Sequence, residues 1–258
     1  MGRRKTVACY IADMTHADSA EIHPADPPAD LPTELIATAD RLLDWRWEDT
    51  PIAGQSWPLA VAADPDAMLI DACKRQDNGE QGVIDPFWAA TWRAASGLDR
   101  FLETQQLDGQ SVLELGCGTG HAGISAALRG AHVTLTDGVE DPLHLVRLSS
   151  HPIADRCEIR RLRFGIDRLD RTFPIILGSD VTYLRQLWPE LEQCLQDHLA
   201  PGGVVLLSDP YRIIANEFRE WIGKRPWKYT EHKLEMKDDP EHPIRVMELH
   251  AIDPHQVA

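Results

Sequence analysis

The sequence predicts an α/β fold with a doubly wound, mostly parallel sheet that is covered by helices on both faces. Between residues 111 and 209, short apolar strands alternate with helical patterns, which is typical of a parallel sheet. A glycine-rich turn follows the first of these strands, at the place where such sheets bind ligands. The chain has 258 residues, of which 43% are hydrophobic, so it is long enough to bury a sizeable hydrophobic core in one domain with an appended segment.

The composition excludes several classes of protein. The net charge is −15 and no basic stripe offsets it, so we expect no nucleic-acid partner. No apolar run approaches the roughly 20 residues that span a bilayer, and the apolar stretch near the start breaks at Asp13, short of a signal peptide. Five widely spaced cysteines and eleven histidines show no disulfide framework and no metal-ligand spacing, so we expect no metal. We therefore expect a cytoplasmic protein without membrane contacts, and a monomer.

Three segments follow one another along the chain. Residues 1–32 are acidic and contain prolines without periodicity, so we expect them to be disordered. Residues 33–84 are expected to form a cap, with a helix over 33–45 and two strands around the turn at Ala53-Gly54. Residues 85–258 are expected to form the main domain.

The elements of the main domain follow from its periodicity. One helical face within residues 85–103 is predicted from the spacing of its apolar side chains, which are Trp88, Trp92, Ala95, Leu98 and Leu102. Strands are predicted over 111–115, 132–137, 157–164, 175–180 and 204–209, and helices over 119–129, 142–149 and 189–199. Gly130 and Gly202 are predicted helix terminators, and Pro142 and Pro189 are predicted helix starts. Residues 227–236 and 244–253 are predicted to form an antiparallel hairpin at the sheet edge.

The stretch "SVLELGCGTGHAGIS" carries the glycines of the first strand-to-helix turn. Gly116, Gly118 and Gly120 permit backbone angles and a close ligand approach that a Cβ would prevent. The following helix start offers free N–H groups to an anion. A dinucleotide fingerprint would require glycine where His121 stands, and no lysine follows as in a P-loop. The turn is therefore expected to bind a ligand other than a dinucleotide pyrophosphate or a nucleoside triphosphate.

Two carboxylates narrow the identity of that ligand. Asp137 ends the second strand, where an acidic residue can accept both hydroxyls of a ribose. Glu114 lies inside the first strand, and a buried carboxylate needs a cationic or donor-rich partner. A ribose, a small carboxylate and a positive centre together describe S-adenosylmethionine.

The motif "VLELGCGTG" resembles the cofactor loop of class I, seven-strand methyltransferases. "DPFWAATW", "LRFG" and "ILGSDVTY" are similar to the group that includes many protein-lysine methyltransferases, and the resemblance covers about residues 85–252. It implies a seven-stranded, Rossmann-like sheet and an S-adenosylmethionine-dependent enzyme. The residues that it implies for cofactor binding are Trp92, Glu114, Gly116, Cys117, Gly118, Gly120, Asp137, Phe164 beside the adenine, and Ser179. Two departures are Arg93, where relatives often carry proline, and Phe164, where they often carry tryptophan.

The same resemblance implies that residues 179–183 line a methyl-transfer channel. Asp180 and Tyr183 are the candidate catalytic residues, because they can orient an amine. A carboxylate raises the pKa of a nearby ammonium, so Asp180 is a better binder than base. Ordinary core packing of Phe164 and a helix-start packing role for Tyr183 remain open.

The function predicted from the sequence is N-methylation of a lysine side chain in a protein substrate. A small-molecule amine or an oxygen nucleophile remains open as the acceptor. A non-catalytic module that binds S-adenosylmethionine, and a nicotinamide-dependent oxidoreductase on the same sheet, are the alternatives from other classes.

Overall fold

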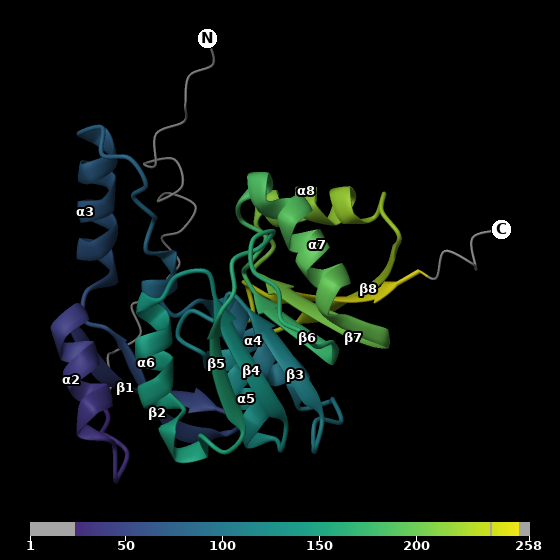
Figure 1. Cartoon of the computed structure of the whole chain (residues 1–258). Helices are drawn as coiled ribbons and strands as arrows, with labels where there is room; N and C mark the ends of the chain where they lie inside the picture. The colour runs from purple at the N-terminus through teal and green to yellow at the C-terminus, as the bar shows by residue number, and fades with distance from the viewer. Residues whose placement is uncertain (1–23, 238, 253–258) are drawn as a thin grey trace.

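A computed structural model describes residues 24–237 and 239–252, and its centre is a seven-stranded sheet (Figure 1). The strand order is β5-β4-β3-β6-β7-β9-β8. The strands are β3 (Ser111–Leu115), β4 (His132–Asp137), β5 (Cys157–Arg161), β6 (Phe173–Ser179), β7 (Leu199–Asp209), β8 (Trp227–Leu234) and β9 (Ile244–Ala251). The strands β5, β4, β3, β6 and β7 pair in parallel, and β9 runs antiparallel to both of its neighbours. The predicted fold class is confirmed.

Helices cover both faces of this sheet. One face packs against α4 (Arg93–Leu102), α5 (His121–Leu128) and α6 (Asp141–Ser149), and the other against α7 (Trp188–His198) and α8 (Ile213–Ile222). Strand β3 divides its side chains between the two cores, because successive side chains of a strand point to opposite faces. Val112 joins the α4–α6 core, whereas Leu113 and Leu115 join the α7–α8 core.

The front region packs onto the sheet domain rather than standing apart from it. It consists of α2 (Thr33–Leu42), the hairpin β1 (Trp45–Ile52) and β2 (Gln55–Ala62), and α3 (Pro65–Asp77). Ser149 of α6 anchors the hairpin: its Oγ accepts a hydrogen bond from Ala60 N at 2.8 Å, and its carbonyl accepts one from Trp57 Nε1 at 3.0 Å. The hairpin residues Ile52 and Leu59 are fully buried in the α4–α6 core. The predicted helix and hairpin of the cap are therefore present and contribute to the main core.

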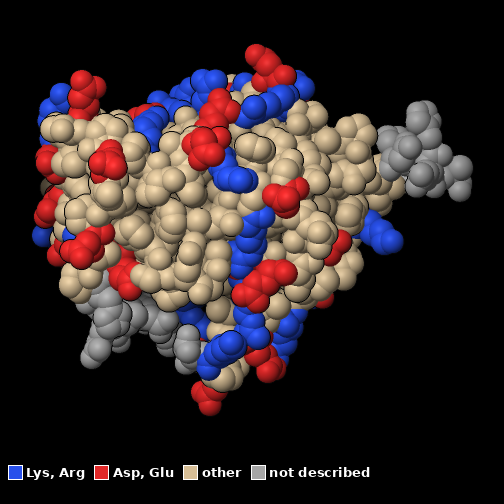
Figure 2. All heavy atoms as spheres, turned by 90° about the horizontal axis from the view of Figure 1, so that it is seen from below, with Lys and Arg blue, Asp and Glu red and all other residues tan. Residues whose placement is uncertain are grey.

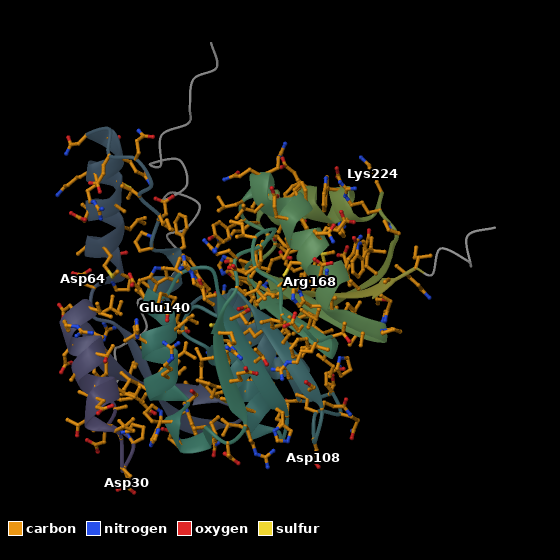
Figure 3. The ribbon with its side chains drawn as sticks, viewed as in Figure 1. Asp30, Asp64, Asp108, Glu140, Arg168 and Lys224 are labelled. Atoms are coloured by element: carbon orange, nitrogen blue, oxygen red, sulfur yellow. The ribbon has the colours of Figure 1, made fainter. Side chains whose placement is uncertain are left out.

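Helix α3 was not predicted from the sequence. Asp64, labelled at its lower end in Figure 3, caps it by accepting a hydrogen bond from Ala67 N at 2.9 Å, and Pro65 occupies its first turn. The helix rises beyond the sheet (Figure 1), and only Ala72 of its side chains is buried. Of the segment 1–32 that was predicted to be disordered, residues 1–23 lie outside the described residues. Its remaining part begins with Pro24, which forms a β-bridge with Glu48.

The predicted helix within residues 85–103 is shorter than its apolar spacing suggested. Trp88 lies in a one-turn 3-10 helix (Phe87–Ala89), and Trp92 lies at the N-cap of α4. The Trp92 Nε1 donates a 2.7 Å hydrogen bond to the Phe87 carbonyl and so closes the intervening turn. The prediction that Trp88 and Trp92 share a helical face is wrong, because this turn breaks the helix before α4 begins.

Several other predicted boundaries moved. Strand β5 ends at Arg161, so Phe164 lies in the following loop. Strand β7 begins at Leu199, directly after α7, so Gly202 adopts its φ of +75° inside a strand and does not terminate the helix. Gly130 follows α5 with a φ of +96°, as predicted. Helix α8 was not predicted.

Although the net charge is negative, at least one face of the molecule carries both basic and acidic side chains (Figure 2). Figure 2 shows basic and acidic side chains interspersed on the face seen from below. Arg160 and Arg171, for example, both form ion pairs with Glu158. None of the helices in residues 24–237 and 239–252 is long and apolar enough to cross a membrane.

Candidate active site

A cavity of about 510 Å³ lies where the parallel strands end. Its walls come from the segments that follow β3, β4, β5 and β6 and from the segment that precedes α4. Figure 3 gives the direction of the strands: Asp108 precedes β3 at the bottom, and Glu140 follows β4 at the opposite edge of the sheet. The cavity therefore occupies the carboxyl edge, where the loops of neighbouring parallel strands converge.

The turn between β3 and α5 brings its backbone to the cavity. Gly116, Gly118 and Gly120 have φ values of +59°, +50° and +82°, a left-handed region that favours glycine. Gly116 and Gly118 line the cavity together with Cys117 and Thr119. Gly120 does not line it: a Cβ there would lie 3.2 Å from Val146 Cγ2, so its small size serves the packing of the α5 start. The predicted close approach of a ligand therefore concerns the first two glycines of the turn.

Glu114 lies beneath the turn and does not line the cavity. Its side chain lies on the same face of β3 as Val112, which is the face covered by α5. The Glu114 Oε2 accepts a 3.0 Å hydrogen bond from Gly123 N on α5, and the residue is fully buried. Burial, aided by the Asp137 charge, raises the pKa of Glu114 to about 8. The expected direct contact between Glu114 and the ligand is therefore not supported by its position.

Asp137 lies at the end of β4 and lines the cavity. Its Oδ2 accepts a hydrogen bond from Gly118 N at 3.1 Å, and its Oδ1 accepts one from Val139 N at 3.0 Å. Burial raises the pKa of this carboxyl, and the backbone hydrogen bonds oppose that change. Because a carboxylate has about four lone-pair sites, each oxygen can accept one further hydrogen bond. Two adjacent hydroxyl groups are suitable donors for this arrangement.

Aromatic side chains form much of the remaining wall. Trp92 and Phe164 line the cavity from the segment before α4 and the loop after β5. Tyr183 lines it after β6 and packs edge-on against Phe87, with ring centres 5.3 Å apart. Burial raises the pKa of Tyr183, so its phenol remains protonated at neutral pH. Trp88 also lines the cavity, although its spacing had suggested a place on a core-facing helix.

Asp180 adopts a φ of +53° directly after β6, and its N–H donates a 2.8 Å hydrogen bond to the Ser208 carbonyl. Its carboxylate is 7% exposed and forms a 2.8 Å ion pair, through Oδ2, with Arg212 Nη2. Burial raises the pKa of Asp180 to about 6, Arg212 lowers it, and the Asp209 charge raises it. The carboxylate is therefore mostly ionised at neutral pH, although it is nearly buried.

Most of the predicted site residues meet in this one cavity. Those that line it are Trp92, Gly116, Cys117, Gly118, Asp137, Phe164, Ser179, Asp180 and Tyr183. Glu114 and Gly120 do not. Sequence reasoning missed Arg212, which follows the end of β7 and therefore lies on the same carboxyl edge. Among the described residues, no group of three or more His, Cys, Asp or Glu side chains could hold a metal ion.

Comparison with protein families gives a match over residues 71–220 to a model described as lysine methyltransferase. The chain belongs to this lysine methyltransferase family. Every residue that lines the cavity, and Arg212 as well, lies within the matched range. The predicted resemblance to the group that includes protein-lysine methyltransferases is thereby confirmed.

Several named proteins are similar to this chain over part of their length. EEF1A lysine methyltransferase 3 of Mus musculus is 34% identical over 134 residues, which cover 48% of this chain and 56% of that protein. Protein N-lysine methyltransferase METTL21A of Danio rerio is 39% identical over 141 residues, which cover 50% of this chain and 63% of that protein. The chain thus spans less than two thirds of the length of these relatives.

Solved structures confirm the fold. The glycopeptide N-methyltransferase MtfA complexed with S-adenosyl-L-methionine has a TM-score of 0.53 at 16% identity, over 62% of this chain and 88% of that one. The ribosomal protein L11 methylase from Lactobacillus delbrueckii subsp. bulgaricus has a TM-score of 0.52 at 15% identity, over 64% of this chain and 81% of that one. At this identity the likeness concerns the arrangement of the sheet and its helices.

Proposed function

We propose that the chain is an S-adenosylmethionine-dependent N-methyltransferase that transfers a methyl group to a lysine side chain of a protein. The observation that carries this proposal is the continuity of the cavity. One space of about 510 Å³ joins the glycine turn and Asp137 to Asp180 and Tyr183. In this proposal the end with the glycine turn and Asp137 is the cofactor half and the end with Asp180 and Tyr183 is the acceptor half, and one shared cavity is what a direct transfer between two bound molecules requires.

The cofactor half fits S-adenosylmethionine by its donor and acceptor groups. The Asp137 carboxylate would accept the ribose hydroxyls with the lone pairs that Gly118 and Val139 leave unused. The glycine turn would hold the methionine part against backbone atoms. Trp92 and Phe164 would contact the cofactor with their rings. The bound cofactor supplies an electrophilic methyl group on a sulfonium.

The acceptor half favours an amine that arrives as a cation. A lysine ammonium has an ordinary pKa near 10.4, so only about one in a thousand is neutral near pH 7.4. Asp180 would bind the ammonium, and Tyr183 would orient the nitrogen once a proton has left to solvent. Positioning of the nucleophile in line with the methyl group can contribute several kcal/mol to the rate, so a strong base is not required.

A protein substrate is favoured by the family and by the names of its relatives. The two relatives described above are named for protein lysine or for EEF1A lysine. A small-molecule amine or an oxygen nucleophile is the alternative acceptor. The cytoplasmic location and the monomeric state are also part of the proposal; the free thiols of Cys73, Cys117, Cys157 and Cys194 agree with a reducing compartment.

The test is transfer of label from methyl-labelled S-adenosylmethionine to a lysate of the source organism. Products are separated above and below about 5 kDa, on the order of a short peptide, and protein hydrolysates are analysed for methyl-lysine. We expect label in methyl-lysine of the protein fraction. With saturating cofactor, Asp180→Ala and Tyr183→Phe should lower the rate, by on the order of a hundredfold for a mispositioned nucleophile, and leave cofactor affinity within a few-fold. Label confined to the small-molecule fraction would contradict the protein substrate and support a small-molecule acceptor. The absence of any labelled product would contradict the enzymatic function and support a module that only binds the cofactor.

A further inference from the structure

Arg212 extends from the start of α8 to two residues of the cavity wall. Its guanidinium lies 5.1 Å from the centre of the Trp92 ring and forms the 2.8 Å ion pair with Asp180. The Arg212 side chain is 20% exposed, so the pair is largely shielded from water. A shielded ion pair is stronger than an exposed one, because the surroundings screen it less.

A buried network fixes the backbone from which Arg212 extends. Asp209 ends β7, and Arg245 of β9 holds both of its carboxylate oxygens, with Nε at 2.9 Å and Nη2 at 3.0 Å. Arg245 is fully buried and also donates to Asn216 Oδ1 of α8 at 2.9 Å. The Asp209 Oδ1 accepts a 2.7 Å hydrogen bond from Tyr211 N, and Tyr211 has a φ of +59°. These contacts hold the backbone on both sides of Arg212 and so fix the point from which its side chain extends.

We propose that Arg212 is a positioning residue for the methyl acceptor: it holds the Asp180 carboxylate in the cavity as an anion, ready to receive a lysine ammonium. This inference rests on the proposed function. The ion pair engages Oδ2 of Asp180, so Oδ1 is the oxygen that would accept from the ammonium. Arg212 itself does not line the cavity, and it acts on the acceptor through Asp180.

The charges around Asp180 explain why a positive group is needed there. Asp209 of β7 is negative and disfavours a second negative charge at Asp180. Arg245 offsets the Asp209 charge locally, and the Tyr183 phenol stays neutral. Within the part of the chain that the structure describes, Arg212 is therefore the cation in direct contact with Asp180. Without it, burial and Asp209 would raise the pKa of Asp180 further above its present value of about 6, and the acceptor would meet a neutral acid.

The experiment compares Arg212→Met, Arg212→Lys and the wild-type chain. Methylation of lysate protein is measured with saturating cofactor at limiting lysate, at several pH values between about 6 and 9, and each variant rate is divided by the wild-type rate at the same pH. The ratio removes the titration of the acceptor lysine itself. For Arg212→Met we expect a loss of at least about tenfold near pH 7 that shrinks to about threefold or less near pH 9, because Asp180 ionises again. Arg212→Lys keeps the cation and should stay within about threefold throughout.

Arg225→Met is the matched control. Arg225 lies 3.9 Å from the centre of the Trp221 ring, and its Nε lies 3.0 Å from Glu192 Oε2, so it has the same pair of contacts away from the cavity. Its ratio should be independent of pH. For all variants, calorimetric titration should give a cofactor affinity within about threefold of wild type, because Asp137 and the glycine turn are unchanged.

A constant ratio across the pH range for Arg212→Met would mean a merely structural role and would overturn the inference. A ratio above one would also overturn it, because Arg212 would then obstruct the acceptor. Failure of the proposed function can be distinguished from failure of this inference, because in that case the wild-type chain itself would produce no methyl-lysine in the lysate proteins.

Discussion

Replacing Glu114 by glutamine should change how the stability of the ligand-free protein depends on pH. Glu114 is fully buried, its Oε2 accepts a hydrogen bond from Gly123 N, and its Oε1 has no hydrogen-bond partner within the described part of the chain. Burial, followed by the Asp137 charge, raises its pKa from 4.5 to about 8 in the folded protein, against the effect of the Gly123 hydrogen bond. Glu114 is therefore neutral at pH 7, and it must lose a proton in a dry environment when the solution becomes alkaline.

The difference between the pKa values of Glu114 in the unfolded and folded protein determines how the folding stability changes with pH. The pKa of Glu114 is higher in the folded protein than in the unfolded chain, so a proton bound to Glu114 stabilises the folded state. The stabilisation is fully present below about pH 4.5 and is lost as the pH rises through about 8. At 1.36 kcal/mol for each tenfold change in proton concentration, the loss between pH 6 and pH 9 is roughly 2 to 3 kcal/mol. That is a large share of the roughly 5 to 15 kcal/mol by which a domain is stable.

The glutamine side chain of this variant cannot ionise, but it has a cost of its own. Its carbonyl can accept from Gly123 N, whereas its amide places two N–H donors without an acceptor where the protonated carboxyl has one O–H donor, and this extra unsatisfied donor costs about 1 to 3 kcal/mol. We therefore expect Glu114→Gln to be less stable than wild type at pH 6 and equally or more stable at pH 9. Urea unfolding of both proteins at intervals between these pH values measures the crossing. The exposed Glu220→Gln serves as the control, and parallel curves for Glu114→Gln and wild type would refute this account of Glu114.

Three further changes test the turn, the ribose partner and the packing. Gly118→Val places a branched side chain at a φ of +50° and 3.5 Å from the Trp88 carbonyl, so calorimetric titration should show cofactor affinity reduced at least about tenfold; unchanged affinity would remove the turn from the site. Asp137→Ala should weaken cofactor binding at least about tenfold through two lost hydrogen bonds, and a large fall in the thermal midpoint with unchanged affinity would make Asp137 structural. Gly97→Ala puts a Cβ 2.4 Å from Ile244 Cγ2 without any left-handed φ, so the free energy of unfolding in urea should fall by about 1 to 3 kcal/mol, and an unchanged value would mean that β9 yields at no cost.

The sequence predicted the central strands well because their limits are chemically marked. Strands 111–115 and 132–137 were predicted with the bounds that the structure has, since each is a short apolar run that ends at a glycine or at Asp137. The glycine turn was also predictable, because alternate left-handed residues require glycine. Local backbone chemistry therefore sufficed for the elements that position the proposed cofactor half of the cavity.

The position of Glu114 shows where that reasoning failed. Its closeness in sequence to Gly116 suggested a shared ligand, but the period of a strand places Glu114 with Val112, on the face that α5 covers. The alternation was visible in the sequence. What the sequence did not show is that α5 would bring Gly123 so close that a Cβ there would lie 2.3 Å from Glu114 Oε2.

The positions of Arg212 and Trp88 at the cavity could not be predicted from the sequence, because they depend on contacts between distant segments. The Arg212 contacts with Asp180 and Trp92 join the start of α8 to β6 and to the segment before α4. Helix α8 itself was not predicted, so its first residues had no predicted location. Trp88 fitted a helical spacing and was moved into the cavity wall by the turn that Trp92 closes with Phe87. No local pattern distinguishes these arrangements from ordinary packing.

Three carboxylates lie buried near the ends of β3, β4 and β6, and the way in which each is stabilised suggests its role. Glu114 has one backbone N–H and is neutral at pH 7, so it offers a cation no charge. Asp137 receives two backbone N–H groups, which are fixed dipoles that a ligand cannot displace without unfolding the turn, so it is suited to accept from neutral hydroxyls. Asp180 is stabilised by the side chain of Arg212, and a side-chain cation can share a carboxylate with a second cation. Of these three carboxylates, Asp180 is therefore the one suited to bind an ammonium ion, which supports the proposal that the cofactor binds at the β4 end of the cavity and the acceptor at the β6 end.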